Sequence, residues 1–315
     1  MNPPENPREP VQTPRSACDA LHRDLDAAMA ESAPLAWKWA PQTCHRNPQD
    51  GTTCAPYHRV WQYLLLLGIT KSLRTDTAFL LDAFRRLAST GSTRVQISAT
   101  ADYGLLAHVL RAYEIEGVEP EVTVLDRCET SLELNRWYAK RFGATISTVQ
   151  GDAVEYDAPG SFDVICAHSF LSWVPPEAQL KMVSTWGRNL SPGGHLITTK
   201  RLRPESKYGT VKHYGEMEAL AFREKARKVA VEHSGRINIS PEILADAALD
   251  YALSYARYPI ASNEALCDLI ARGGMTVVTL DDSEETAPSE DRPVSGPTQG
   301  AGKRVRVIAR RDVAG

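Results

Sequence analysis

The sequence predicts an α/β protein with a doubly wound, mostly parallel, seven-stranded sheet, an antiparallel terminal hairpin and a helical N-terminal cap. Three observations predict this architecture. From residue 94 onward, short β-rich segments alternate with amphipathic helices, as in parallel sheets with right-handed crossovers. Residues 16–88 contain only helical patterns. The last two strands are joined by a Pro- and Gly-rich loop and not by a helix, which favours a hairpin.

Composition narrows the class of protein. The 315 residues, 43% of them hydrophobic, suffice for one large domain with an accessory. The 36 Lys and Arg residues and 39 Asp and Glu residues give a net charge of −3, so a nucleic-acid partner is not expected. No apolar run approaches the roughly 20 residues that cross a bilayer, and the N-terminus lacks a secretory h-region. We therefore expect no membrane partner and a cytoplasmic location.

The first third of the chain divides into a tail and a cap. Residues 1–15 are rich in Pro, Glu and Asn and are predicted to be disordered. Residues 16–92 are predicted to form the helical cap, with Thr75 as the N-cap of its last helix. Apolar spacing predicts the cap helices at 16–31, 57–67 and 75–88.

Residues 93–315 are predicted to form the sheet domain, with a helical insertion at 205–260. The strands are expected at 94–99, 121–126, 145–149, 162–167, 195–199, 275–280 and 303–310. The helices are expected at 103–112, 131–142, 176–190, 214–233, 241–258 and 263–272. Residues 281–302 are expected to be a flexible loop.

The six cysteines are dispersed along the chain and are interpreted as free thiols. Cys44, His45, Cys54 and His58 offer four potential zinc ligands. Their spacing fits no compact zinc pattern, and adjacent Cys-His residues do not easily point inward together. The sequence therefore predicts no metal site.

Ligands of parallel sheets bind beyond the carboxyl ends of the strands. In the stretch from Ser98 to Gly104, after the first strand, the small residues Ala99, Ala101 and Gly104 would let backbone approach a nucleotide-like ligand. The same stretch contains Asp102. The stretch is not a GxGxxG motif, and an ordinary strand-to-helix turn explains it equally well.

Three further strand ends carry polar residues. Asp126 ends the second strand, where a carboxylate can accept both hydrogen bonds of a ribose diol. Asp152 follows the third strand and could accept from an adenine amino group. Each aspartate could instead cap a loop. His168 and Ser169 follow the fourth strand, and Trp173 comes next, for which core packing is an equal alternative.

The run from Arg94 to Thr199 resembles the class I SAM-dependent methyltransferase superfamily, whose fold is Rossmann-like. The stretch FDVICAHSFLSWVPPEAQLKMVSTWGRNLSPGGHLITTKR is the most specific feature, and the terminal hairpin also matches the family. The glycine-rich first motif is degenerate, and Asp102 is expected to take over contact with the methionine ammonium. The resemblance implies S-adenosyl-L-methionine as cofactor. The residues expected to bind it are Ser98, Ala99, Ala101, Asp102, Asp126, Arg127, Gly151, Asp152, Ala153, His168, Ser169 and Trp173.

The resemblance implies a SAM-dependent transferase. We expect it to methylate a small-molecule acceptor from metabolism, including secondary metabolism. Tyr57, His58 and His168 are the catalytic candidates, with aromatic residues of the cap surrounding the sulfonium. One alternative is SAM-consuming chemistry without methylation, either cyclisation to azetidine-2-carboxylate or aminocarboxypropyl transfer, both of which release methylthioadenosine. The other is a non-catalytic binding or regulatory protein.

Overall fold

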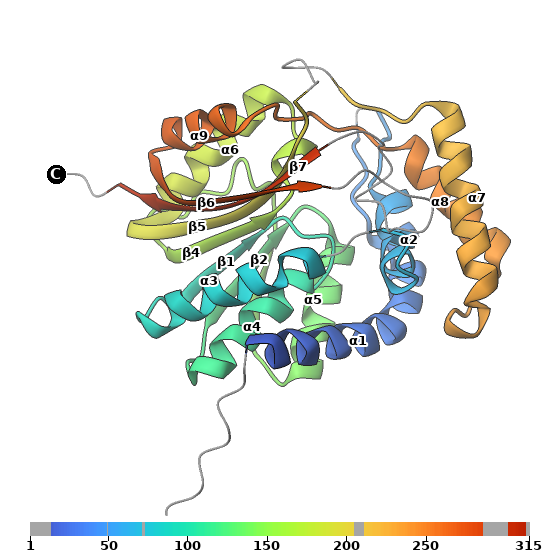
Figure 1. Cartoon of the computed structure of the whole chain (residues 1–315), viewed down its shortest axis with the longest axis horizontal. Coiled ribbons are helices and arrows are strands. Elements are labelled where there is room, and N and C mark those ends of the chain that lie inside the picture. The colour runs from blue at the N-terminus through green and yellow to red at the C-terminus, as the bar shows by residue number, and fades with distance from the viewer. Residues whose placement is uncertain (1–13, 49, 71–72, 205–210, 286–301, 313–315) are drawn as a thin grey trace, which may run out of the picture.

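The computed structural model describes residues 14–48, 50–70, 73–204, 211–285 and 302–312. Its sheet has seven strands in the order β3-β2-β1-β4-β5-β7-β6. The pairs among β1 to β5 are parallel, and β7 lies antiparallel between β5 and β6. This topology confirms the predicted fold class, including the terminal hairpin (Figure 1).

The strands agree closely with the predicted positions, apart from longer β5, β6 and β7. They are β1 Arg94–Ser98, β2 Glu121–Asp126, β3 Ile146–Gln150, β4 Phe162–His168, β5 Leu190–Leu202, β6 Met275–Glu285 and β7 Gly302–Arg311. β5 begins before the strand predicted at 195–199 and includes the Pro192-Gly193-Gly194 segment. Residues 286–301, most of the expected flexible loop, and residues 1–13 of the expected disordered tail lie outside the described residues.

The helices form two layers on the sheet and a group beside it (Figure 1). One layer contains α3 Thr77–Ser89, α4 Gly104–Glu116 and α5 Glu129–Phe142, and the other α6 Pro176–Asn189 and α9 Asn263–Arg272. The group beside the sheet contains α2 Ala55–Leu66, α7 Glu216–Glu232 and α8 Pro241–Leu253. Within the described ranges, no helix has the length and apolar character needed to span a membrane.

The first helix, α1 Pro14–Thr43, is longer than predicted because it continues through Pro34 and Pro41. Its N-terminal half packs with the α3–α5 layer, while Ala33 belongs to the core shared with α2 and α8. A proline inside a helix costs roughly 3 kcal/mol. Here the buried alanines Ala36 and Ala40 show that tertiary packing continues past Pro34. α1 thus connects the sheet domain to the helical group.

The start of α3 is fixed by an ion-pair cluster. The N-cap is Asp76 and not the predicted Thr75, and the Asp76 side chain makes no cap hydrogen bond. Its fully buried carboxylate instead contacts Arg304 and Arg306 of β7 and His168 of β4. Burial acts to raise the pKa of Asp76, but His168 and Arg304 outweigh it and hold the pKa well below its usual value. The cluster joins the N-terminal helices to the terminal hairpin.

We predict that Asp76→Asn lowers the free energy of unfolding by roughly 3–5 kcal/mol, because two buried guanidinium groups lose their counterion. Asp82→Asn on the same helix is the control, since the Asp82–Arg86 pair is exposed and contributes less than about 0.5 kcal/mol. Denaturant unfolding of both variants measures the difference. Equal stabilities would show that Asp76 does not stabilise the fold through these pairs.

Candidate functional site

A cavity of about 550 Å³ lies at the carboxyl ends of β1, β2 and β4. β1 and β4 are adjacent at the centre of the sheet, with β2 and β5 on either side. Because the strand order reverses between β1 and β4, their loops diverge and leave a crevice, where doubly wound sheets bind ligands. Residues of α2, α8 and the segment after α8 also line the cavity, so the helical group covers it.

The loop after β1 has an unusual backbone. Ala99 has φ of 57°, a left-handed conformation that costs a non-glycine residue about 1–2 kcal/mol. Its N–H donates to the Leu125 carbonyl at 2.8 Å, and the N–H of Thr100 donates to Asp126 at 2.9 Å. Strained backbone that neighbouring contacts hold in place is typical of functional sites.

Asp102 ends this loop inside the cavity wall. Its Oδ1 accepts from the N–H of Gly104 at 2.7 Å, and the side chain is buried. Burial raises the pKa of Asp102, although the Gly104 N–H and His58 oppose the shift. A Cβ on residue 104 would lie only 2.5 Å from the Leu73 side chain, which explains the glycine where α4 begins.

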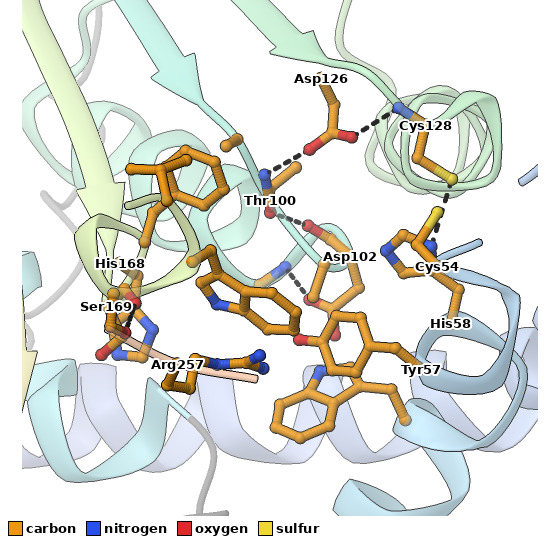
Figure 2. Close-up of a pocket in the computed structure, with 18 of the residues that line it drawn as sticks. Cys54, Tyr57, His58, Thr100, Asp102, Asp126, Cys128, His168, Ser169 and Arg257 are labelled. Carbon is orange, nitrogen blue, oxygen red and sulfur yellow. Dashed lines mark hydrogen bonds between the residues drawn. The ribbon is translucent and has the colours of Figure 1, made fainter. Parts of the chain in front are cut away.

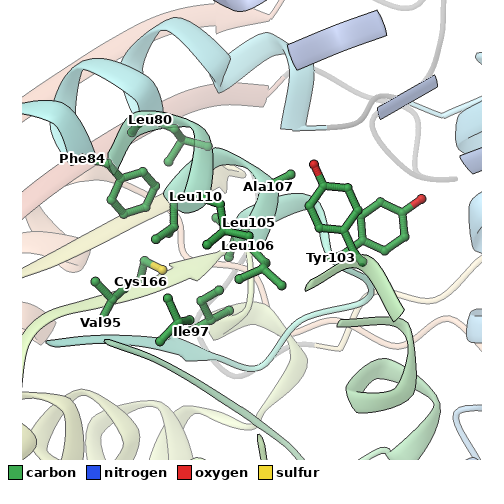
Figure 3. Packing of buried hydrophobic residues seen from close by; sticks show 14 of the residues in the cluster. Leu80, Phe84, Val95, Ile97, Tyr103, Leu105, Leu106, Ala107, Leu110 and Cys166 are labelled. Atoms are coloured by element: carbon green, nitrogen blue, oxygen red, sulfur yellow. The ribbon is translucent and has the colours of Figure 1, made fainter. Parts of the chain in front are cut away.

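Asp126 holds three segments of the site together (Figure 2). Its Oδ2 accepts from the N–H of Thr100, and its Oδ1 accepts from the N–H of Cys128 at 2.7 Å. Burial raises the pKa of Asp126 to about 6, with smaller opposing effects from His58 and these two N–H groups. Each carboxylate oxygen keeps a lone pair for a further donor.

Two predicted cofactor residues do not line the cavity. The Ser98 hydroxyl is fully buried and accepts from the indole N–H of Trp186 at 2.8 Å, so it belongs to the core. Asp152 accepts from the N–H of Val154 at 2.9 Å and lies 3.8 Å from Arg127. The other ten predicted cofactor residues do line the cavity, namely Ala99, Ala101, Asp102, Asp126, Arg127, Gly151, Ala153, His168, Ser169 and Trp173.

An aromatic wall faces the β1 and β4 loops (Figure 2). Tyr57 is at its centre, with ring centroids 5.0 Å from those of Trp61 and Trp173 and 5.4 Å from that of Tyr251. All four rings line the cavity. Burial raises the pKa of Tyr57 well above its usual value, so the phenol stays neutral and does not act as a base near pH 7.

The wall beyond β4 and β5 is cationic. Lys200, Arg257 and Arg304 line it, and the Arg257 guanidinium stacks on Trp173. Burial, helped by the neighbouring arginines, lowers the pKa of Lys200 well below its usual value. His168 Nε2 lies 3.0 Å from Asp76, and burial lowers the pKa of this histidine despite the carboxylate. One ring nitrogen of His168 is therefore already engaged in the ion-pair cluster.

The His58 ring contacts two cysteine thiols and a serine hydroxyl. Its Nδ1 lies 3.3 Å from Cys44 Sγ and 3.2 Å from Cys128 Sγ, while Nε2 lies 3.2 Å from the Ser131 hydroxyl. Both ring nitrogens have partners, which does not favour the predicted catalytic role. His45, the other histidine of the sequence quartet, instead contacts Arg127.

Sequence reasoning missed the cationic wall and the fourth member of the thiol cluster. Lys200 follows the strand predicted at 195–199, and Arg304 lies in an alternating strand about 100 residues away, so neither gives a local signal. Cys128 directly follows the singled-out pair Asp126 and Arg127. A cysteine at the start of a helix beside a strand-end carboxylate was the available signal.

One family model matches part of the chain. Residues 103–194 match the family model described as "Methyltransferase domain". No curated protein matches the sequence. This matched segment runs from the end of the β1 loop into β5 and includes Asp126 and His168.

Solved structures with a similar fold include several methyltransferases. A SAM-dependent methyltransferase from Methanosarcina mazei is 14% identical, with a TM-score of 0.45 over 71% of this chain and 94% of that one. N-methyltransferase NodS from Bradyrhizobium japonicum WM9, in complex with S-adenosyl-L-homocysteine, is 12% identical, with a TM-score of 0.42 over 73% and 85%. The apo S-adenosylmethionine-dependent methyltransferase SibL is 16% identical, with a TM-score of 0.46 over 95% and 74%. These similarities are too distant to indicate a substrate.

The family match covers a central part of the chain, and the sheet around it has the terminal hairpin expected from the resemblance. Residues 103–194 are therefore similar to a methyltransferase domain.

Proposed function

We propose that the protein transfers a methyl group from S-adenosylmethionine to a small-molecule acceptor that binds in the same cavity. The observation that carries this proposal is the two-sided cavity. Asp102 and Asp126 lie on the side of β1 and β2, while Lys200, Arg257 and Arg304 lie on the side of β4 and β5. A cavity volume of about 550 Å³ is within the usual range for small ligands.

The carboxylate side fits the cofactor. Asp126 would accept from the two ribose hydroxyls through its remaining lone pairs. Asp102 would face the methionine ammonium, and the small residues Ala99 and Ala101 would let backbone approach the same portion. Because the Asp152 carboxylate accepts a hydrogen bond within its own loop, we assign the adenine contact to the segment around Gly151 and Ala153.

The aromatic wall would stabilise the sulfonium. S-adenosylmethionine supplies the activated methyl group when it is bound. Tyr57, Trp61 and Trp173 have aromatic rings whose faces attract a cation. The helices α2 and α8 would exclude water from the reacting atoms. The rate of nucleophilic displacement at a sulfonium is raised mainly by positioning the nucleophile and excluding water.

The cationic wall indicates the character of the acceptor. Arg257 is positioned for an acidic group, since guanidinium ions bind carboxylate well, whereas the Arg304 guanidinium is already paired with Asp76. The lowered pKa of Lys200 favours a neutral amine, and a neutral amine could take a proton from the nucleophile. We therefore propose an acidic small molecule as the acceptor.

One observation favours a second reaction. Asp102 is buried, and its pKa is raised, so it could accept a proton from the methionine ammonium. The freed amine would then attack its own chain carbon next to sulfur. A C–N bond would form, the C–S bond would break, and methylthioadenosine would leave with both electrons. Such a reaction needs no acceptor.

Incubation with and without acceptors separates the two reactions. We expect the protein with S-adenosylmethionine alone to form no product, and a panel of small carboxylic acids to yield S-adenosylhomocysteine with at least one member. Chromatography with mass detection measures both products. Methylthioadenosine formed in the absence of any acceptor would instead support internal displacement. Calorimetry that detects no cofactor binding would support a non-catalytic protein.

The carboxylate of Asp126 gives a prediction for cofactor affinity. Asp126→Asn should weaken S-adenosylmethionine binding by about 1–3 kcal/mol, because charge-assisted hydrogen bonds are lost. Asp152→Asn is the control and should stay within about twofold, since Asp152 does not line the cavity. Titration calorimetry measures both values. Equal losses in the two variants would remove Asp126 from its assigned role.

The same carboxylate predicts a pH dependence. Ribose hydroxyls require ionised Asp126, whose pKa is raised to about 6. Affinity should therefore be constant well above this pKa and should fall as the pH drops through it, by up to about tenfold per pH unit. Asp126→Asn should flatten this part of the profile. A profile that is equally steep in both proteins would contradict the assignment.

The aromatic wall predicts selectivity for the charged cofactor. Tyr57→Leu should reduce the preference for S-adenosylmethionine over neutral S-adenosylhomocysteine by about 2- to 30-fold, the equivalent of about 0.5–2 kcal/mol. Tyr57→Phe keeps the ring and should retain the preference. The ratio of the two dissociation constants is the measurement. An unchanged ratio in Tyr57→Leu would show that this ring does not face the sulfonium.

A further inference from the structure

Four potential metal ligands from distant parts of the chain meet at the edge of the cofactor cavity. The ligand atoms of Cys44, Cys54, His58 and Cys128 all lie within 4.8 Å of one another. Cys44 follows α1, Cys54 and His58 lie at the start of α2, and Cys128 precedes α5. Cys44, Cys54 and Cys128 are free thiols. Three thiols and one imidazole form a donor set typical of structural zinc sites.

We propose that Cys44, Cys54, His58 and Cys128 bind one zinc ion in a closed tetrahedral site. Zinc bonds of about 2.3 Å to sulfur and 2.0–2.1 Å to nitrogen place neighbouring ligand atoms about 3.5–3.8 Å apart in a tetrahedron. Here Cys44 and Cys128 have their Sγ atoms 3.5 Å apart. His58 Nδ1 lies 3.3 and 3.2 Å from these two sulfurs. Small movements would complete the coordination sphere.

The surroundings of the four ligands match those of a metal site. With Nδ1 on the metal, the Nε2–H of His58 donates to the Ser131 hydroxyl, which lies 3.2 Å away. Metal-bound histidines usually have such a partner for the second nitrogen. The Thr130 hydroxyl lies 3.2 Å from Cys44 Sγ, where it can donate to a thiolate. Both hydroxyls come from the first turn of α5.

The positions of the cysteines favour thiolates. Cys54 and Cys128 are the N-cap residues of α2 and α5, and the positive end of a helix dipole stabilises a thiolate. Soft thiolates with an imidazole select zinc over magnesium, calcium and manganese. All four positions would be filled by the protein, so the ion would be structural and would leave no place for substrate.

The main alternative is a disulfide between Cys44 and Cys128. A disulfide requires a sulfur separation of about 2.05 Å and a two-electron oxidant. It would leave Cys54 and His58 without a role, although both lie in the same cluster. Zinc accounts for all four residues and releases the thiol protons to solvent as it binds.

The proposed ion would connect the covering helices to the cofactor loop. Cys128 donates its N–H to Asp126, while His58 follows Tyr57 of the aromatic wall. Zinc would therefore fix the distance between the residue assigned to the ribose and the ring assigned to the sulfonium. Loss of the metal should loosen the cap and weaken cofactor binding together.

Metal analysis of the full-length protein tests the proposal. We expect about one zinc per chain after purification in zinc-containing medium, as for other four-ligand sites. Cobalt should replace it and give thiolate-to-metal charge-transfer absorption with tetrahedral d–d bands. Chelation should lower the melting temperature by several degrees, since metal binding contributes to folding.

Matched variants separate a metal site from ordinary packing. Cys128→Ser and Cys54→Ser should lose most of the zinc, whereas Cys267→Ser, with its thiol outside the cluster, should keep it. His58→Cys should keep the zinc and shift the cobalt spectrum toward that of a four-thiolate site, a result that packing alone would not give. Ser131→Ala should weaken zinc binding by about 10- to 100-fold.

Three results would overturn the proposal. One is wild-type protein that holds less than about a tenth of an equivalent of zinc and takes up no cobalt. Another is a Cys44–Cys128 disulfide detected by mass spectrometry of protein that was alkylated under native conditions. Bound iron or copper in place of zinc would also contradict it.

Discussion

The carboxylate of Asp126 is the constraint on which the rest of the site depends. Its two oxygens accept from the N–H groups of Thr100 and Cys128, so one side chain fixes the loop after β1 and the start of α5 against the end of β2. The left-handed backbone at Ala99 is held within this arrangement. The loop after β1 lacks the usual glycines. Hydrogen bonds to its backbone nevertheless hold it in a defined shape, including a left-handed conformation that glycine adopts without strain.

The covering helices give this sheet its particular chemistry. The sheet contributes carboxylates and small residues at the strand ends, while α2 and α8 contribute Tyr57, Trp61 and Tyr251. The buried ion pairs of Asp76 with β7 join the N-terminal helices to the opposite edge of the cavity. The terminal hairpin is thus joined to the start of α3, and the thiol cluster joins α2 to the start of α5. An enclosed sulfonium and an acidic acceptor are the consequences we infer.

Local sequence patterns predicted those features of the fold and site that depend on residues close together in the chain. The alternation of strands and helices gave the sheet, and residues at the strand ends gave ten of the cavity residues, including Asp126 and His168. The length of α1 was not predictable, because the packing of Ala36 and Ala40 outweighs the effect of Pro34. Thr75 was a plausible cap by residue type. The helix instead begins after Asp76, whose carboxylate is paired with Arg304, more than 200 residues away in the sequence. Cys128 could not be recognised as a fourth ligand from the sequence, because only the folded chain brings the start of α5 beside His58 of α2.

The central claim is that the nucleoside of the cofactor lies on Asp126 with its sulfur facing the aromatic wall. A crystal structure of the complex with S-adenosylhomocysteine tests it most directly. We predict that both ribose hydroxyls lie within hydrogen-bond distance of the Asp126 carboxylate and that the sulfur lies against Tyr57 and Trp173. A nucleoside bound at other strand ends, or with its ribose turned away from Asp126, would contradict the account.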